Sequence, residues 1–347
     1  MSPTNSRSSA TSRRRFLTAG GALALGPLLA ACGSDDKDTT GSQAETTRSG
    51  GPWSFKDDRG RAAKTENKPE RIVAFVSTAA ALYDYGIDCT GIFGPSEPVD
   101  GKPNPQAGDM NVSELTSLGT AWGQFNVEKY AALQPDLLVS NMFPPPELWF
   151  VPEESKKKVE ALAPTVGISV ARTSLLNPLK RTAELAESLG ADLSAKKVTD
   201  AKARFEKAIE TLRTTAKGNG GLKVMAITGD KDNFYVAVPD SYCDLNYFKD
   251  LGVEFVEGKN SDEWGFWEFL SWENADKYHA DLIMVDNRSA SMSLKQLNDK
   301  ATWRQLPAVK AGQTTPWSME ERFSYAGWAP VVERLAAAVE KTKKLKA

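Results

Sequence analysis

Short apolar runs alternate with segments of helical periodicity through the first half of the body of this chain. Uninterrupted apolar runs predict strands, and apolar residues that recur every three or four positions predict helices. The predicted strands are 72–76, 91–94, 136–140 and 165–170, and the predicted helices are 78–85, 128–133, 152–162 and 177–189. Strands that alternate with helices in this way are typical of an α/β fold with a mostly parallel sheet.

One long helix is predicted over 194–217. Its apolar residues form a continuous stripe along an otherwise charged segment, and they are Val198, Ala201, Phe205, Ala208, Ile209 and Leu212. At about 1.5 Å per residue the helix would extend for ~36 Å, which is longer than most helices within a domain. A glycine-rich run that begins at Gly218 ends it.

A second alternation follows the long helix. The predicted strands are 222–228, 253–256, 281–285 and 314–317, and the predicted helices are 244–251 and a terminal one from Val331. This half of the chain therefore also predicts an α/β unit.

A short motif recurs in the two halves. A capping residue, Asn126 or Ser271, precedes a glutamate by two positions, and Glu128 or Glu273 precedes an Asp-Leu strand start by eight. The repeat favours two pseudo-symmetric α/β lobes, each with a glutamate in the first turn of a helix. The alternative is that both acids only stabilise helix N-termini.

The N-terminal segment predicts export. Residues 12–17 read Ser-Arg-Arg-Arg-Phe-Leu, and an apolar stretch from 19 to 31, too short for a transmembrane helix, precedes Cys32. The arginine pattern resembles a twin-arginine (Tat) signal over 1–31, and Leu-Ala-Ala-Cys resembles a bacterial lipobox, in which Cys32 is lipidated. The polar remainder of 32–52 predicts a flexible tether. The alternative is a buried apolar segment with a cysteine there by chance.

Composition excludes several classes of function. The 43 basic and 45 acidic residues leave no positive excess for nucleic-acid binding. His279 is the only histidine, and its position before a strand suggests the end of a helix rather than a metal ligand. Three cysteines cannot form a disulfide scaffold, and Cys89 and Cys243, in different halves, are expected to be free buried thiols.

Candidate ligand-binding residues lie where strands end. Ligands of open α/β sheets bind beyond the carboxyl ends of the strands, and loop aromatics there suit a large, flat or greasy organic ligand. The candidates are Thr78, Trp122, Phe125, Phe143, Tyr235, Tyr242, Trp264, Arg288, Trp317, Arg322 and Tyr325. For each aromatic residue, ordinary packing is the alternative.

These features together resemble a known family. The lipobox cysteine, the tether and the segments WSFKDDRGR, KPERIVAF and LGTAWGQFNVEKYAALQPDLLVS are similar to those of the substrate-binding lipoproteins of iron–siderophore ABC importers. The resemblance implies an N-terminal lobe (53–190) and a C-terminal lobe (219–347) joined by one rigid helix within 191–218. It also implies a monomer on the outer face of the cell membrane, held there only by its lipid, that binds a ferric siderophore between the lobes and is not an enzyme.

The same resemblance suggests roles for particular residues. Glu128 and Glu273 would pair with arginines of a dimeric permease. The siderophore would supply all the iron ligands, so no cofactor or protein-bound metal is expected. Arg288 and Arg322 would bind the oxygen-rich face of the chelate, unless they form ordinary ion pairs.

Two other interpretations stay open at this point. The fold family also serves cobalamin and haem, although haem usually needs an axial ligand that His279 is poorly placed to supply. An exported enzyme is the other possibility. However, the sequence contains no Gly-x-Ser-x-Gly, P-loop or Gly-x-Gly-x-x-Gly motif.

Overall fold

The computed structural model describes residues 51–99 and 101–346. The predicted signal segment 1–31, the predicted lipidation site Cys32 and all but the last two residues of the predicted tether lie outside these ranges. No helix in the described ranges is both long enough and apolar enough to cross a membrane.

The first sheet is parallel throughout, as its apolar runs predict. Its strand order is β5-β4-β3-β6-β7, and the strands are β3 (Ile72–Phe75), β4 (Gly91–Phe93), β5 (Thr116–Ser117), β6 (Leu137–Met142) and β7 (Thr165–Ser169). The central strands β3 and β6 are buried at every position. Parallel strands covered on both faces have this continuous apolar pattern.

Four helices belong to this half of the chain and match the predicted ranges closely. They are α1 (Val76–Asp84), α2 (Val127–Ala132), α3 (Glu153–Leu162) and α4 (Leu176–Ser188). The side chain of Asn126 caps α2, because its oxygen accepts a hydrogen bond from the Lys129 backbone N–H.

An N-terminal hairpin, which the sequence analysis missed, packs against this half. Strand β1 (Trp53–Lys56) pairs antiparallel with β2 (Ala62–Thr65). The buried carboxylate of Asp57 accepts hydrogen bonds from the backbone N–H groups of Arg59, Arg61 and Gly167. The last of these bonds fixes the hairpin to β7.

The second sheet is mixed rather than purely parallel. Its order is β11-β9-β8-β12-β13, with β10 beside β8, and its strands are β8 (Lys223–Gly229), β9 (Asn233–Ala237), β10 (Glu254–Phe255), β11 (Trp267–Ser271), β12 (Leu282–Asp286) and β13 (Thr314–Trp317). The antiparallel β9 and its partner β11 were not predicted. Strand β9 was missed although its residues 234–237 form an uninterrupted apolar run, and β11 was missed because the buried Glu268 interrupts its apolar run.

The helices of the second half need two corrections. They are α6 (Cys243–Asp250), α7 (Leu294–Asp299), α8 (Ala301–Gln305), α9 (Pro307–Lys310) and α10 (Tyr325–Lys341). Helix α10 begins before the predicted Val331, because Ser324 caps its first turn and Trp328 is fully buried there. Pro330 therefore lies inside the helix.

The second correction concerns Glu273. Its segment forms one 3-10 turn (Trp272–Asn274) rather than the predicted α-helix. The Ser271 side chain makes no capping hydrogen bond. The buried Trp272 instead donates its indole N–H to the Asp230 carbonyl, which holds the chain against the sheet.

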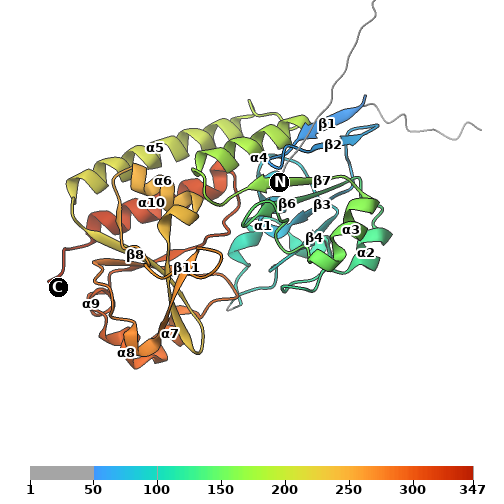
Figure 1. The fold of residues 1–347 in the computed structure, drawn as a ribbon. Helices are drawn as coiled ribbons and strands as arrows, with labels where there is room; N and C mark the ends of the chain where they lie inside the picture. The colour runs from blue at the N-terminus through green and yellow to red at the C-terminus, as the bar shows by residue number, and fades with distance from the viewer. Residues whose placement is uncertain (1–50, 100, 347) are drawn as a thin grey trace, which may run out of the picture. The chain divides into compact units, whose positions relative to one another are not determined.

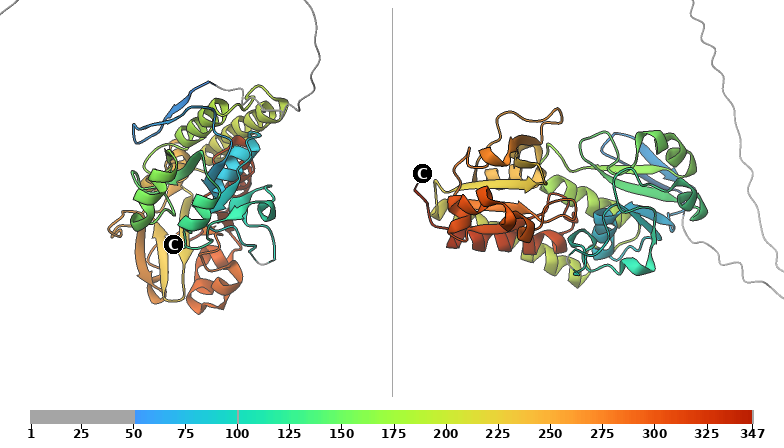
Figure 2. Two further views of the ribbon diagram at one scale, coloured as in Figure 1. Left: turned by 90° about the vertical axis from the view of Figure 1, so that its right-hand side faces the viewer. Right: turned by 90° about the horizontal axis from the view of Figure 1, so that it is seen from below.

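Helix α5 (Lys196–Gly218) is the predicted long helix, and it contacts both halves. Near its start, Val198 lines a small pocket together with Tyr85 at the end of α1. At its other end, Ala216 and Val224 of β8 line another small pocket. Figure 1 shows α5 passing both sheets with α10 packed along it, and Figure 2 shows the same pairing from two further sides. Two α/β halves joined by one long helix are the predicted fold class, which is confirmed.

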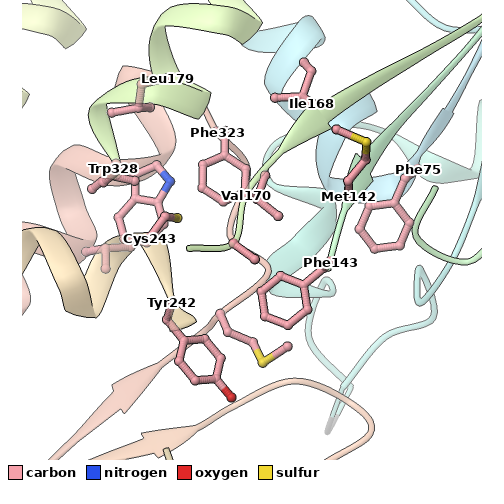
Figure 3. Packing of buried hydrophobic residues seen from close by; sticks show 14 of the residues in the cluster. Phe75, Met142, Phe143, Ile168, Val170, Leu179, Tyr242, Cys243, Phe323 and Trp328 are labelled. Carbon is pink, nitrogen blue, oxygen red and sulfur yellow. The ribbon is translucent and has the colours of Figure 1, made fainter. Parts of the chain in front are cut away.

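One hydrophobic cluster is continuous between the halves. It includes both faces of the first sheet, the inner sides of α5 and α10, and one face of the second sheet. Figure 3 shows part of it, with Phe143 of the first half beside Tyr242 of the second. A smaller cluster covers the opposite face of the second sheet. The two sheets consequently belong to one compact unit.

Candidate ligand-binding site

Loops at the carboxyl edge of the first sheet bring together four aromatic residues. Trp122 follows β5, while Phe143, Trp149 and Phe150 follow β6. The Trp122 ring lies 4.9 Å from that of Trp149 and 5.2 Å from that of Phe150, and Trp149 lies 5.5 Å from Phe143. We call these four residues the N-side cluster. Trp122 is 63% exposed and so presents a free aromatic face to a ligand.

Phe150 has a strained backbone conformation. Its φ is 61°, in the left-handed region that a bulky residue rarely adopts. Such strain persists only where the surroundings enforce it, and it is common in functional loops. Here it directs the Phe150 ring towards Trp122 and Trp149.

The register of the second sheet places five residues in a row across one of its faces. Phe269 of β11 lies opposite Tyr235 of β9, and Tyr235 lies opposite Thr228 of β8. Val285 is paired with Ile227, so Asp286 of β12 lies next to Thr228. Asp286 is in turn paired with Trp317 of β13. We call these five residues the cross-sheet row; it has aromatic rings at both ends and polar groups in the middle.

The two halves touch through stacked aromatic rings. The ring centroids of Phe143 and Phe266 are 4.4 Å apart, with an interplanar angle of 27°. Tyr242 packs against both rings and also lies 5.2 Å from Trp317, which belongs to the cross-sheet row. The N-side cluster and the cross-sheet row are therefore linked by a continuous series of aromatic contacts. The Phe143 and Tyr242 rings of this series are visible in Figure 3.

Trp317 is anchored by a buried carboxylate. Its indole N–H donates a hydrogen bond of 2.7 Å to Asp244, near the start of α6. Burial raises the pKa of Asp244 to about 6, although the Trp317 hydrogen bond opposes the rise. Trp317 itself is only 1% exposed, so this bond fixes it within the protein.

Arg288 is neutralised by two carboxylates. Its guanidinium lies 2.7 Å from Asp286 and also pairs with Glu320. Gln106, from the first half, donates a hydrogen bond of 2.6 Å to the same Glu320. Burial opposes ionisation of Asp286, but the charge of Arg288 holds the pKa of that carboxyl below its usual range. The predicted ligand-binding arginine is therefore part of a buried ionic network.

Arg322 is likewise engaged within the protein. Its guanidinium lies 2.7 Å from Asp84 at the end of α1, 3.4 Å from Asp109 and 3.9 Å from Glu321. Burial raises the pKa of Glu321 to about 7. Arg322 connects the segment after β13 to the first half of the chain.

The remaining candidates divide into two groups. Trp264 is 52% exposed in the turn before β11, and Tyr235 donates its hydroxyl to Asp230. Three others pack within the protein. Thr78 is buried and donates to the Asn141 side chain, Phe125 contacts Phe93 and Tyr130, and Tyr325 contacts Phe205 of α5.

Several residues of the N-side cluster and the cross-sheet row were not predicted from the sequence. Trp149 and Phe150 lie further along the loop that Phe143 begins after β6, so extending the strand-end rule along that loop could have found them. Thr228 and Phe269 were harder to find, because their place in the row depends on strands β9 and β11, which were not predicted.

A cavity of about 850 Å³, lined in part by Arg288, lies between residues 98–99 and 102–105 of the first half and the segments 285–296 and 314–316 of the second. Its lining includes the polar side chains of Lys102, Asp286, Ser291 and Lys295 beside several prolines. None of the aromatic residues of the N-side cluster lines it. The cavity therefore adjoins the Asp286 side of the cross-sheet row rather than the N-side cluster.

Glu128 and Glu273 are both exposed. Glu128 lies in the first turn of α2 and Glu273 in the 3-10 turn described above. Each precedes a strand of its own sheet, β6 or β12.

Metal-ligating side chains do not cluster in the described residues, where no group of three or more His, Cys, Asp and Glu side chains could hold an ion. His279 is partly exposed and lies 3.5 Å from Asp281. Within the same ranges Cys89 and Cys243 are buried free thiols, as predicted, and burial raises the pKa of both.

Two α/β halves that are joined by a long helix and touch through aromatic rings are typical of bilobal binding proteins. The family model described as periplasmic binding protein matches residues 73–317, and the chain belongs to this family. The family suggested by the sequence is thereby confirmed at this level.

Particular relatives extend the comparison. The chain is 50% identical to DesE, a ferric-siderophore receptor protein from Streptomyces coelicolor, over 85% of this chain and 100% of that one, with a TM-score of 0.82. It is 26% identical to the iron(3+)-hydroxamate-binding protein FhuD of Bacillus subtilis (strain 168), over 84% of this chain and 86% of FhuD. The petrobactin-binding protein YclQ from Bacillus subtilis, at 19% identity and a TM-score of 0.65, shares the fold over 84% of this chain and 99% of its own.

Proposed function

We propose that this protein is an extracytoplasmic binding protein of an ABC importer that captures a ferric siderophore between two lobes. The lobes are residues 53–190 and 219–347, and the helix within 191–218 joins them. The observation that carries the proposal is the 50% identity to a ferric-siderophore receptor, which extends over the whole of that receptor. The protein is a carrier rather than an enzyme.

The chemistry of the site suits such a ligand. A ferric siderophore is a large organic shell around an iron whose coordination the siderophore itself completes, so the protein needs no metal ligands of its own. Exposed aromatic faces bind such a shell with little loss of side-chain entropy. Trp122 and Trp264 offer exposed faces, and Tyr235 offers a half-buried one. Phe143, Tyr242 and Trp317 support the site from behind.

Other predicted residues have supporting roles in this proposal. Thr78, Phe125 and Tyr325 hold the scaffold, and Arg288 and Arg322 hold the segments around the site through their carboxylate partners. The relative named as a hydroxamate-binding protein makes ferric hydroxamates the first ligands to test.

Delivery and anchoring are the parts of the proposal that rest on the sequence. Glu128 and Glu273, one from each lobe, dock onto a permease dimer, where exposed charge pairs orient the two proteins. Export follows the Tat signal of residues 1–31. The lipid on Cys32 holds the monomer at the outer face of the membrane, and the remainder of 32–52 gives it reach.

Tryptophan fluorescence tests the binding proposal. The protein is titrated with ferrioxamine B, ferrichrome, a ferric tris-catecholate and ferric citrate, and separately with cyanocobalamin, haemin and ferric chloride. The proposal expects quenching at submicromolar concentrations by at least one ferric siderophore and none by ferric chloride. Quenching by cyanocobalamin or haemin alone would assign the protein to another ligand. No response to any siderophore would refute the proposal.

A further inference from the structure

The segment after β7 makes backbone contacts with the second half of the chain. Ala171 forms an isolated antiparallel bridge with Tyr242, and the Arg172 backbone N–H donates a hydrogen bond of 3.1 Å to the Ser241 carbonyl. Arg172 itself has φ 53°, in the left-handed region, where non-glycine residues are uncommon. Contacts with the second half therefore fix an unfavourable backbone conformation at this residue.

The Arg172 side chain extends over the aromatic site. Its guanidinium carbon lies 5.4 Å from the centre of the Phe266 ring, which is the ring that stacks on Phe143. One of its terminal nitrogens donates to the carbonyl of Trp264, whose own side chain is half exposed. Arg172 is an exposed residue.

Arg172 differs from Arg288 and Arg322, the two arginines predicted from the sequence, in whether carboxylates pair with its charge. Arg288 and Arg322 each pair with at least two carboxylates. Within residues 51–99 and 101–346, Arg172 has no carboxylate oxygen within 4.0 Å. A guanidinium has five N–H donors in a planar fork, and here only one hydrogen bond, to a neutral carbonyl, engages it.

We propose that Arg172 is the residue that binds the oxygen face of the chelate. This inference rests on the function proposed above, and it assigns to Arg172 the role that the sequence analysis gave to Arg288 and Arg322. The coordinating oxygens of a ferric siderophore carry negative charge, and charge-assisted hydrogen bonds from a guanidinium are about twice as strong as neutral ones. The Phe266 ring holds the fork in place, because a guanidinium stacks favourably on an aromatic face.

Binding measurements on substituted proteins test this role. Arg172→Gln removes the charge and the fork, and Arg172→Lys keeps only the charge. The matched control is Arg181→Gln, because Arg181 also lies over an aromatic ring, 4.7 Å from the centre of Phe55, but on the α4 side of the first half. Each protein is titrated with whichever of ferrioxamine B and ferrichrome binds the wild type, and its melting temperature is recorded.

We expect Arg172→Gln to weaken binding at least tenfold, Arg172→Lys to weaken it less, and Arg181→Gln to leave it within twofold. Arg172 is exposed, so its two substituted proteins should melt close to the wild type. Wild-type binding with less than a twofold change in Arg172→Gln would overturn the role of Arg172 and leave the proposed function standing. Equal losses in Arg172→Gln and Arg181→Gln would overturn it too. Failure of the wild type to bind either chelate, or any other siderophore of the panel, would refute both proposals.

Discussion

The ring of Phe143 stacks on the ring of Phe266 with their centroids 4.4 Å apart. Phe143 belongs to the loop after β6 in the first half, and Phe266 directly precedes β11 in the second. Both rings are at least nine-tenths buried. The pair therefore ties the two halves together at that point.

Removing either ring should destabilise the protein. Phe143→Ala and Phe266→Ala should each lower the free energy of unfolding by about 3–5 kcal/mol, because each leaves a cavity at a buried position. The double substitution should cost less than the sum of the two, by about 0.5–1.5 kcal/mol, since the stacking contact can be lost only once. Urea unfolding of the four proteins measures this coupling.

The pair Phe93 and Phe125 is the matched control. These rings lie 5.1 Å apart within the first half alone. Their coupling should be of similar size, but only the Phe143–Phe266 cycle should also change the affinity for a ferric chelate. Strict additivity of Phe143→Ala and Phe266→Ala would show that the stacked pair does not tie the halves together.

Trp122 should matter for binding and not for stability. Because it is 63% exposed, Trp122→Ala should change the free energy of unfolding by less than about 0.5 kcal/mol. Its loss should weaken ferric chelate binding about tenfold or more, a cost of about 1.4 kcal/mol. Fluorescence titration measures the affinity. Tyr83→Ala, at an exposed position near the end of α1, is the control and should bind as the wild type does. Unchanged affinity in Trp122→Ala would remove Trp122 from the site.

Arg288 should matter mainly for stability. Arg288→Met leaves Asp286 and Glu320 buried without their cation, so the free energy of unfolding should fall by about 3–5 kcal/mol. The deficit should shrink in acid, where the Asp286 carboxyl, whose pKa Arg288 lowers in the wild type, becomes protonated. Chemical unfolding at several pH values measures both effects. Arg304→Met, at an exposed position without a carboxylate partner in the described residues, should be nearly neutral. A stable Arg288→Met protein that fails to bind would instead make Arg288 a ligand contact.

Asp244 predicts a particular pH dependence. Its pKa is raised to about 6 in the folded protein, against about 3.9 in an unfolded chain. The group therefore favours the folded state most below about pH 4, and this contribution is lost as the pH rises through about 6. Asp244→Asn keeps an oxygen acceptor for the indole N–H of Trp317 and carries no titrating group. Its stability relative to wild type should thus rise by about 2 kcal/mol between pH 4 and pH 7.

Thermal or urea unfolding of Asp244→Asn and wild type across this range tests the prediction. Asp240→Asn, at an exposed carboxylate in the turn before α6, is the control. A difference between Asp244→Asn and wild type that stays constant with pH would mean that the pKa of Asp244 is the same in the folded protein as in the unfolded chain.

The elements that were predicted well from the sequence are those whose own residues carry a clear apolar pattern. The parallel strand β6 is apolar at most positions because helices cover both faces, and α5 carries its apolar stripe along its whole length. The hairpin β1–β2 and strands β9 and β11 escaped prediction because their stability comes from partners. Asp57, for example, fixes the hairpin to Gly167, far along the chain.

The site was predictable in kind but not in detail. Trp122 and Phe143 follow from the rule that ligands bind at strand ends, whereas Tyr235, predicted by the same rule, lies within strand β9. The ionic network around Arg288 could not be predicted in this way, because its partner Glu320 is 32 residues away and Gln106, which donates to Glu320, lies in the other half. Arg172 was missed for a similar reason: its place over Phe266 depends on the crossing of the segment after β7 to the second half.

The location of the iron tests the central claim most directly. Crystals of the protein grown with a ferric siderophore that quenches its fluorescence should be measured at the iron absorption edge, where anomalous scattering reveals the metal alone. We expect one anomalous peak between the N-side cluster and the cross-sheet row, with the organic shell against Trp122 and Tyr235. A peak only in the cavity of about 850 Å³ that Arg288 lines in part, or on an outer face of either half, would contradict the account.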